Sequence, residues 1–455
     1  MKKNGFKNKS FKSSNLNKKN KLVNGNNKIK GNLNNYRINI LIKNYIIINN
    51  YIAEIIIIIK FIIMLNLFCI MKNKIINFYY FQYSKIELKV KGVGESLIFN
   101  NYSENINFIN EIYINGNKQD IIIDEYLFNQ TDNFVELILS DDITSTKYMF
   151  SGCTNITEIN LSNFNTSLVE EMSYMFNNCS SLTSLDLSNF NTSLVANMFC
   201  IFSGCSSLIS IDLSNFNTTS VFDMGSMFSN CSSLIFLDLS NFNTSYVKLM
   251  DYMFYGCSSL TSLDLSNFNV SLVYLMEYMF YGCSSLAFLD LSSFNTSLVR
   301  IINNMFDGCA KLHSLDLSNF NTSLVINMSN MFYNCINLEY INLKNFIEYQ
   351  LNESLSDYEN MFYNLPENVV ICINENLTEE KILPQIKNLS CHVIDCSNNW
   401  KSKQKKITND TNECIESCDN STQYKYEYNG KCYENCTNGF LYDENNNKLK
   451  NVNVN

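Results

Sequence analysis

Side chains that could do chemistry are few in this sequence, and most of them recur at one fixed spacing. The 455 residues include two histidines, His313 and His392, which leaves little room for histidine-based metal binding or acid–base catalysis. Paired carboxylates could cleave glycosidic bonds, but six equivalent copies suit a binding surface better than an active site. Since the sequence has no phosphate-binding loop, nucleophile motif or metal-binding helix motif, we expect neither an enzyme nor a cofactor. The six carboxylates are 26 residues apart, at Asp186, Asp212, Asp238, Asp264, Asp290 and Asp316.

Aromatic side chains occur in three repeats at the position two residues before the recurring Asp, which is Asn342 in the last repeat. They are Phe236, Phe288 and Tyr340, and most other copies have serine there. One interpretation is a solvated surface whose Ser and Asp side chains hydrogen-bond locally. The other is a docking surface for a basic protein partner or for divalent cations, with the three aromatic residues as anchors.

The seventeen cysteines form two main groups. Eight of them, from Cys153 to Cys335, are 26 residues apart, and we expect a buried column of small apolar side chains with free thiols. Disulfides between adjacent copies are the alternative, because a spacing of about 5 Å is within reach of one. Near the C-terminus, two Cys-x3-Cys pairs favour disulfides outside the cell but would suit zinc in the cytosol, and the spacing leaves the connectivity open. The disulfide candidates are Cys372, Cys391, Cys396, Cys414, Cys418, Cys432 and Cys436.

Potential N-glycosylation sequons (Asn-x-Ser/Thr) also recur. Seven lie in the repeats, from Asn165 to Asn321, where the Asn either serves a turn or carries a glycan. Because adjacent copies would lie about 4.8 Å apart, glycans on all of them would collide. We expect glycans rather at sequons outside the repeats, such as Asn376, Asn388 and Asn420.

The 26-residue period defines the elements that carry these side chains. Within one repeat, Leu182, Leu185 and Leu187 show the alternation of a short strand, and strands of successive repeats must be parallel. Apolar residues from Val195 to Cys205 then fall on one helical face. We therefore predict an α/β fold, a leucine-rich-repeat solenoid over residues 147–365. Its parallel β-sheet forms one face, called here the strand face, and its short helices form the other.

Such a solenoid has open ends that need caps. Alternating apolar residues at 85–90 and an Asn115-Gly116 hairpin signal predict a small β-rich N-terminal cap over residues 84–146. At the other end, residues 366–398 predict a strand–helix–strand cap, and residues 399–455 form a Cys-rich polar tail.

The N-terminal region differs in charge from the rest. Residues 1–60 carry thirteen Lys or Arg against the single acid Glu54, a net charge of +12, so the remainder carries −21 to give the total of −9. An acidic folded region is a poor candidate for nucleic-acid binding, and residues 1–44 are expected to form a disordered basic tail. Residues 45–83 are apolar and could be a signal anchor, a signal peptide or a buried segment. The first two interpretations place everything that follows outside the cell, and Met64 or Met71 could be the true start.

The repeat resembles the BspA-like family of leucine-rich-repeat surface proteins. The matching motif, M-F-x-x-C-x-x-L-x-x-L-D-L-S-x-F-x-T-S-x-V-x-x-M, is nearly complete at 253–276 and 279–302. Departures include Ile201 and Ile302 at Met positions and Leu365 in place of Cys. The resemblance implies a cell-surface or secreted solenoid linked to adhesion and to binding of host or matrix proteins, and it supplies no catalytic residue and no ligand. We expect a surface binding protein, with a structural surface-coat protein as the alternative.

Overall fold

The structure is a computed structural model that describes Lys60 and residues 84–102, 105–352, 355–408, 410–418, 421, 423, 426–428, 431–434, 440–443 and 448–451. The chain divides into two compact units, Met1–Phe81 and Gln82–Asn455, and the second contains the described residues other than Lys60. The predicted basic tail and, apart from Lys60, the predicted signal segment therefore lie outside the described residues. In the part of the chain that is described, no helix has the length and apolar character needed to cross a membrane.

The N-terminal cap is β-rich, as predicted. Its five-stranded sheet has the order β4-β3-β6-β1-β7, and β2 pairs separately with β5. The Asn115-Gly116 turn joins β3 to β4 with both residues in the left-handed region, at φ 50 and φ 80. Strand β7 belongs to the first solenoid coil and pairs antiparallel with β1, so the cap covers the exposed edge of that coil. The elements are β1 (Ser84–Lys91), β2 (Gly94–Leu97), η1 (Asn105–Phe108), β3 (Ile109–Ile114), β4 (Asn117–Lys118), β5 (Glu125–Phe128), β6 (Asp132–Leu139) and β7 (Ile156–Asn163).

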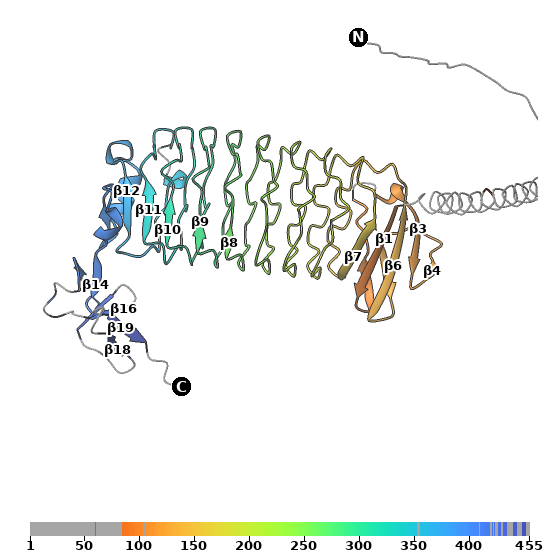
Figure 1. The fold of residues 1–455 in the computed structure, drawn as a ribbon, viewed down its shortest axis with the longest axis horizontal. Coiled ribbons are helices and arrows are strands. Elements are labelled where there is room, and N and C mark those ends of the chain that lie inside the picture. The colour runs from red at the N-terminus through yellow and green to blue at the C-terminus, as the bar shows by residue number, and fades with distance from the viewer. Residues whose placement is uncertain are drawn as a thin grey trace, which may run out of the picture. The chain divides into compact units, whose positions relative to one another are not determined.

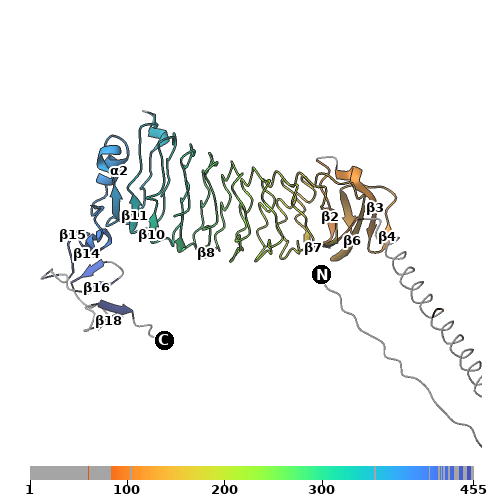
Figure 2. The same ribbon diagram turned by 45° about the horizontal axis from the view of Figure 1, so that its top comes forward.

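The coils of the solenoid stack side by side from β7 to β12 (Figures 1 and 2). The predicted parallel pairing is confirmed for β8 with β9, β10 with β11 and β11 with β12. Other coils are extended on this face without regular strand pairing. A second column of parallel bridges joins successive coils without interruption from Ser145 to Asn327. The strands are β8 (Ser262–Leu263), β9 (Phe288–Leu289), β10 (Ser314–Asp316), β11 (Tyr340–Leu343) and β12 (Val370–Ile373).

The prediction of short helices on the other face was wrong, because the chain there makes consecutive turns. Alternate N–H groups donate to the next coil, as Cys200 does to the carbonyl of Gly225 at 3.0 Å. The N–H groups between them bond three residues back, as Ser203 does to Cys200 at 3.1 Å. Each coil has two left-handed residues four positions apart, such as Cys200 (φ 56) and Gly204 (φ 76), and an α-helix cannot continue through them.

Aromatic and cysteine columns fill the core between the faces. Each repeat cysteine from Cys179 to Cys335 donates its thiol to a phenylalanine carbonyl of the preceding coil, at 3.0–3.2 Å. These thiols are free, as expected, and burial raises the pKa of Cys205 and of Cys257 to about 12, which makes them poor nucleophiles. The phenylalanine rings stack at 5.6–5.9 Å between centroids, in the order Phe150, Phe176, Phe202, Phe228, Phe254, Phe280, Phe306, Phe332 and Phe362.

The C-terminal cap has the predicted order of strand, helix and strand: β12, α2 (Ile382–Lys387) and β13 (Val393–Ile394), with the 3-10 turn η3 (Glu375–Leu377) before the helix. The start of α2 is held by Glu348 of the last coil, whose carboxylate accepts the backbone N–H groups of residues 380, 381 and 382 at 2.7–3.0 Å. A carboxylate at a helix N-terminus is favoured both by these bonds and by the helix dipole.

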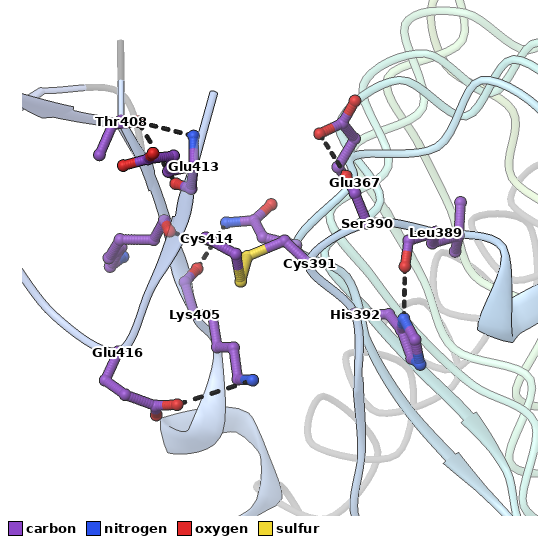
Figure 3. The surroundings of a disulfide bond; sticks show 12 residues. Glu367, Leu389, Ser390, Cys391, His392, Lys405, Thr408, Glu413, Cys414 and Glu416 are labelled. Atoms are coloured by element: carbon purple, nitrogen blue, oxygen red, sulfur yellow. Dashed lines mark hydrogen bonds and ion pairs between the residues drawn. A yellow bond between two sulfur atoms is a disulfide. The ribbon is translucent and has the colours of Figure 1, made fainter. Parts of the chain in front are cut away.

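The described part of the polar tail forms a six-stranded sheet of order β15-β14-β17-β16-β19-β18. Six of the predicted cysteines form disulfides there and in the cap: Cys372–Cys396, Cys391–Cys414 and Cys418–Cys432. Figure 3 shows Cys391–Cys414, which joins the segment after α2 to β15. Cys436 lies outside the described residues. The tail elements are η4 (Trp400–Lys403), β14 (Lys406–Thr408), β15 (Cys414–Ile415), β16 (Tyr426–Tyr428), β17 (Lys431–Tyr433), β18 (Phe440–Asp443) and β19 (Lys448–Asn451).

A column of buried threonines ties each coil to the next. Thr244 donates its hydroxyl to the carbonyl of Asn269 at 3.0 Å and accepts the N–H of the same residue at 2.8 Å. The same pair of hydrogen bonds to the next coil is made by Thr166, Thr192, Thr218, Thr296 and Thr322. At the one intervening copy, Val270 is buried and offers no hydroxyl to Asn295.

This column gives a matched pair of stability predictions. Thr244→Val keeps the shape but leaves two backbone groups without a partner, and we expect it to lower the free energy of unfolding by about 1–3 kcal/mol. Val270→Thr supplies the missing hydroxyl and should raise it by about 0.5–1.5 kcal/mol. Urea denaturation followed by circular dichroism measures both, and equal midpoints for the two variants would contradict the role of the hydroxyl.

Candidate binding surface

The predicted column of aspartates lies exposed on the strand face. Each carboxylate accepts the backbone N–H of the serine two residues later, and all six bonds are 2.9 Å long. This hydrogen bond lowers the pKa of the aspartates from Asp186 to Asp290, so they stay charged at neutral pH. The local bonding supports the interpretation of a solvated face, while the exposed charge is still available to a partner.

The carboxylates of the strand face do not converge on a cation. Among the described residues, no group of three or more His, Cys, Asp or Glu side chains is placed to hold a metal ion. The six aspartates also take no part in the ion pairs of the described chain, which lie in the two ends of the molecule. The column therefore presents separate charges, one per coil.

Two of the three predicted anchors are open to solvent. Phe288 is 68 % exposed and Phe236 is 61 % exposed, on the same side of coils two repeats apart. Ile209 and Ile235, which the sequence analysis did not single out, extend this apolar area with 53 % and 51 % exposure. Their signal in the sequence is a large apolar residue directly after the first Leu of the strand, where other repeats have Thr, Ala, His or Glu.

The third anchor, Tyr340, is already engaged by the chain's own tail. Its ring meets the ring of Trp400 edge to face, with centroids 6.1 Å apart, and its hydroxyl donates to Gln404 Oε1 at 3.1 Å. The ammonium group of Lys401 lies 5.5 Å from the centre of the tyrosine ring and donates to Ser314 Oγ at 2.8 Å. Tyr340 is therefore half-buried rather than a free anchor.

Comparison with known proteins gives the family. The sequence profile described as "Mycoplasma protein of unknown function, DUF285" matches residues 124–236, 207–290 and 261–371, which together cover more than half of the chain. The chain belongs to the DUF285 family. The matched region is the solenoid with the end of its N-terminal cap, and the description of the family names no activity. No curated protein matches.

One solved structure is similar in part to this DUF285 chain. It is a leucine rich cell surface protein from Faecalibacterium prausnitzii A2-165, with 17 % sequence identity, and the match covers 51 % of this chain and 79 % of that one. The TM-score of 0.18 is too low for this likeness to carry an argument about the DUF285 chain.

The sequons of the solenoid serve turns. In each of the seven, from Asn165 to Asn321, the Asn side-chain oxygen accepts the backbone N–H two residues later, at 3.0–3.2 Å. This supports the turn interpretation of these residues. Asn376 and Asn388 are exposed in the C-terminal cap, and Asn420 lies outside the described residues.

Two further surface features were missed by the sequence analysis. The face opposite the strand face, where the chain makes consecutive turns, is called here the turn side. There, Tyr252 stacks on Tyr278 and Tyr255 on Tyr281, both with ring centroids 4.6 Å apart. Along a different edge of the coils runs a column of leucines that are 39–48 % exposed, called here the leucine edge: Leu168, Leu194, Leu272, Leu298 and Leu324. Both are visible in the sequence as tyrosines and leucines at the 26-residue spacing.

Carboxylates on the turn side behave differently from those of the strand face. Burial raises the pKa of Asp223 to about 6, with smaller contributions from the charges of Asp251 and Glu171. Burial also raises the pKa of Asp251, Glu277 and Asp307. A carboxyl whose pKa is higher in the folded than in the unfolded chain stabilises the fold when protonated, and that stabilisation is lost as the pH rises through the folded value.

We therefore expect the solenoid to be more stable at pH 5 than at pH 7. The melting temperature should rise by a few degrees as the pH is lowered from 7 to 5. It should then fall at lower pH, as the strand-face aspartates become protonated. Asp223→Asn keeps the acceptor for the Gly225 N–H and should flatten the rise between pH 5 and 7. Asp238→Asn, on the strand face, should leave the change in melting temperature between pH 7 and pH 5 as it is in the unmodified chain. A melting temperature that falls steadily from pH 7 to pH 5 would contradict the assignment.

Proposed function

We propose that this chain is a cell-surface or secreted binding protein whose strand face recognises a protein or matrix component. The observation that carries the proposal is the exposure of Phe236 and Phe288 beside Ile209 and Ile235. Clustered exposed apolar side chains are costly to a solvated protein and are typical of interaction sites. Large aromatic anchors also dominate the energy of many protein interfaces.

Charge supports a basic partner. Residues 147–365 contain five Lys or Arg against eighteen Asp or Glu, so the whole solenoid carries excess negative charge. The strand-face aspartates recur in six successive coils and would attract a basic surface over a distance of about 8 Å in physiological salt. Recognition along many coils would be shallow and multivalent, as the resemblance to the BspA-like proteins also suggests.

The C-terminal disulfides support a location outside the cytosol. Three disulfides in and next to the C-terminal cap would not persist in a reducing compartment. Together with the apolar segment at residues 45–83, they favour export, either as an anchored or as a secreted protein.

The location can be tested on protein collected from the cell surface or the medium. Alkylation under denaturing conditions without reductant should label the free solenoid thiols but not Cys372, Cys391, Cys396, Cys414, Cys418 or Cys432. These six should be labelled only after reduction. If all six react without reductant, the proposed compartment is wrong.

The central test of the function is attachment to cells or matrix. The double variant Phe236→Ala, Phe288→Ala should reduce attachment at least tenfold, because each exposed aromatic anchor is worth about 1–2 kcal/mol or more in an interface. The fold should be unaffected, since neither side chain is part of the core. A matched control is Leu194→Ala, Leu298→Ala, which removes two exposed apolar side chains from the leucine edge.

The same pair of variants tests the second candidate, a structural surface coat. The leucine edge favours it, because an apolar column that runs along many coils could join two chains side by side. In that case the leucine variant, and not the phenylalanine variant, should lower self-association in sedimentation. Unchanged attachment by the phenylalanine variant would overturn the proposed binding role of the strand face.

A further inference from the structure

The contact between the tail and the strand face shows what kind of group this surface accepts. Trp400 packs against the ring of Tyr340, while the adjacent Lys401 bonds Ser314 Oγ at 2.8 Å and lies over the same tyrosine ring. An aromatic residue followed by a lysine is therefore seated on an aromatic residue and a serine of two neighbouring coils. The basic segment that carries it reads W-K-S-K-Q-K-K at 400–406.

Covalent tethering explains how this segment is held on the surface. The Cys372–Cys396 disulfide fixes the chain before the segment. The Cys391–Cys414 disulfide, which is drawn in Figure 3, fixes the chain after it. A tethered segment binds at a high effective concentration, so its contact need not be strong by itself. Its side chains still show which chemistry complements the strand face.

The same aromatic–serine arrangement occurs elsewhere on the face. Ser314 and Tyr340 are direct partners in the parallel pairing of β10 with β11, and Ser262 and Phe288 are direct partners in the pairing of β8 with β9. Ser210 and Phe236 occupy the same repeat positions two repeats earlier in the chain. Both of these serines are exposed, as are the two phenylalanines.

The alternation of large and small side chains leaves room for an incoming ring. The series Phe236, Ser262, Phe288, Ser314 and Tyr340 places an aromatic residue at every second coil, about 10 Å apart at a strand spacing of about 4.8 Å. One serine stands between successive aromatic residues of this series and leaves a gap there, because its side chain is small. Carboxylates that form no ion pair among the described residues flank these gaps, with Asp264 and Asp290 two residues beyond Ser262 and Phe288.

We infer that the strand face binds peptide segments carrying an aromatic residue next to a lysine, with Ser262–Phe288 and Ser210–Phe236 as the open copies of the Ser314–Tyr340 site. This inference rests on the proposed function and names the chemistry of its partner. The aromatic side chain of the partner packs against the phenylalanine, and its lysine ammonium donates to the serine hydroxyl beside the aspartates. A phenylalanine lacks the hydroxyl with which Tyr340 donates a hydrogen bond to Gln404. The open sites therefore recognise only the aromatic side chain and the lysine of the partner.

The probe that tests this is the chain's own segment as a labelled synthetic peptide, S-N-N-W-K-S-K-Q-K-K, titrated against the full chain by fluorescence anisotropy. Phe288→Ala and Phe236→Ala should each remove one site, and the double variant should weaken binding at least tenfold. Trp400→Ala in the chain should free the tethered site and add one equivalent of bound peptide. The matched control is Tyr246→Ala, an exposed aromatic residue in line with the leucine edge.

Peptide controls separate recognition from charge. Replacing the tryptophan by alanine, or the lysine after it, should lower the affinity about tenfold, whereas a scrambled peptide of equal charge should bind weakly at low salt only. Equal binding of the scrambled peptide, or unchanged binding by the double phenylalanine variant, overturns the inference. A concentration-dependent dimer that Trp400→Ala abolishes would support the inference and would identify the bound segment as the tail of a second copy.

Failure of this inference can be told apart from failure of the proposed function. If the peptide does not bind while attachment still requires Phe236 and Phe288, the strand face is a binding surface for a different chemistry. If neither depends on the two phenylalanines, both the inference and the proposed function are wrong.

Discussion

Hydrogen bonding between successive coils is the constraint on which this structure depends. A coil contains no helix that could satisfy its own backbone, so alternate N–H groups donate to the next coil, as Cys200 does to Gly225. The bridge column from Ser145 to Asn327 and the buried threonines add further bonds along the same direction. No coil is complete without its neighbour, and for this reason both ends carry caps: β1 on the first coil, and β13 beside the last strand.

The period of the sequence predicted the solenoid and most of its core, because each repeat places the same Leu, Phe and Cys at the same depth. It did not predict the turns opposite the strand face. Apolar residues at intervals of three and four lie on one side of a helix, and also on one side of a chain that turns every four residues. The distinguishing signal was the alternation of Gly204, Asn230 and Gly256 at one left-handed position. The other left-handed position holds Asn only in the last three copies, Asn304, Asn330 and Asn360. The earlier copies hold Tyr, Cys or Ser, which do not indicate that conformation.

The candidate surface was predictable to the extent that it depends on the repeat. The aspartates, Phe236 and Phe288 lie where the alternation of the strand puts them. The burial of Tyr340 was not predictable, because Trp400 reaches it from a segment sixty residues further along the chain. The position of that segment depends on the pairing of Cys372 with Cys396 and of Cys391 with Cys414, which spacing alone does not determine.

Where the coils differ is as informative as where they agree. The buried threonines, the turn-forming Asn and the Ser-bonded Asp are committed to the stacking of the coils and recur in nearly every repeat. Residues that recur in this way can set the charge of the surface, which governs approach, but they cannot distinguish one place on it from another. The repeat position that holds Ser262 and Phe288 has different residues in different coils, and both side chains are exposed rather than part of the core. Any selectivity of the strand face must therefore be carried by such positions. The tail contact at Tyr340 is consistent with this, because it engages the variable aromatic and serine directly.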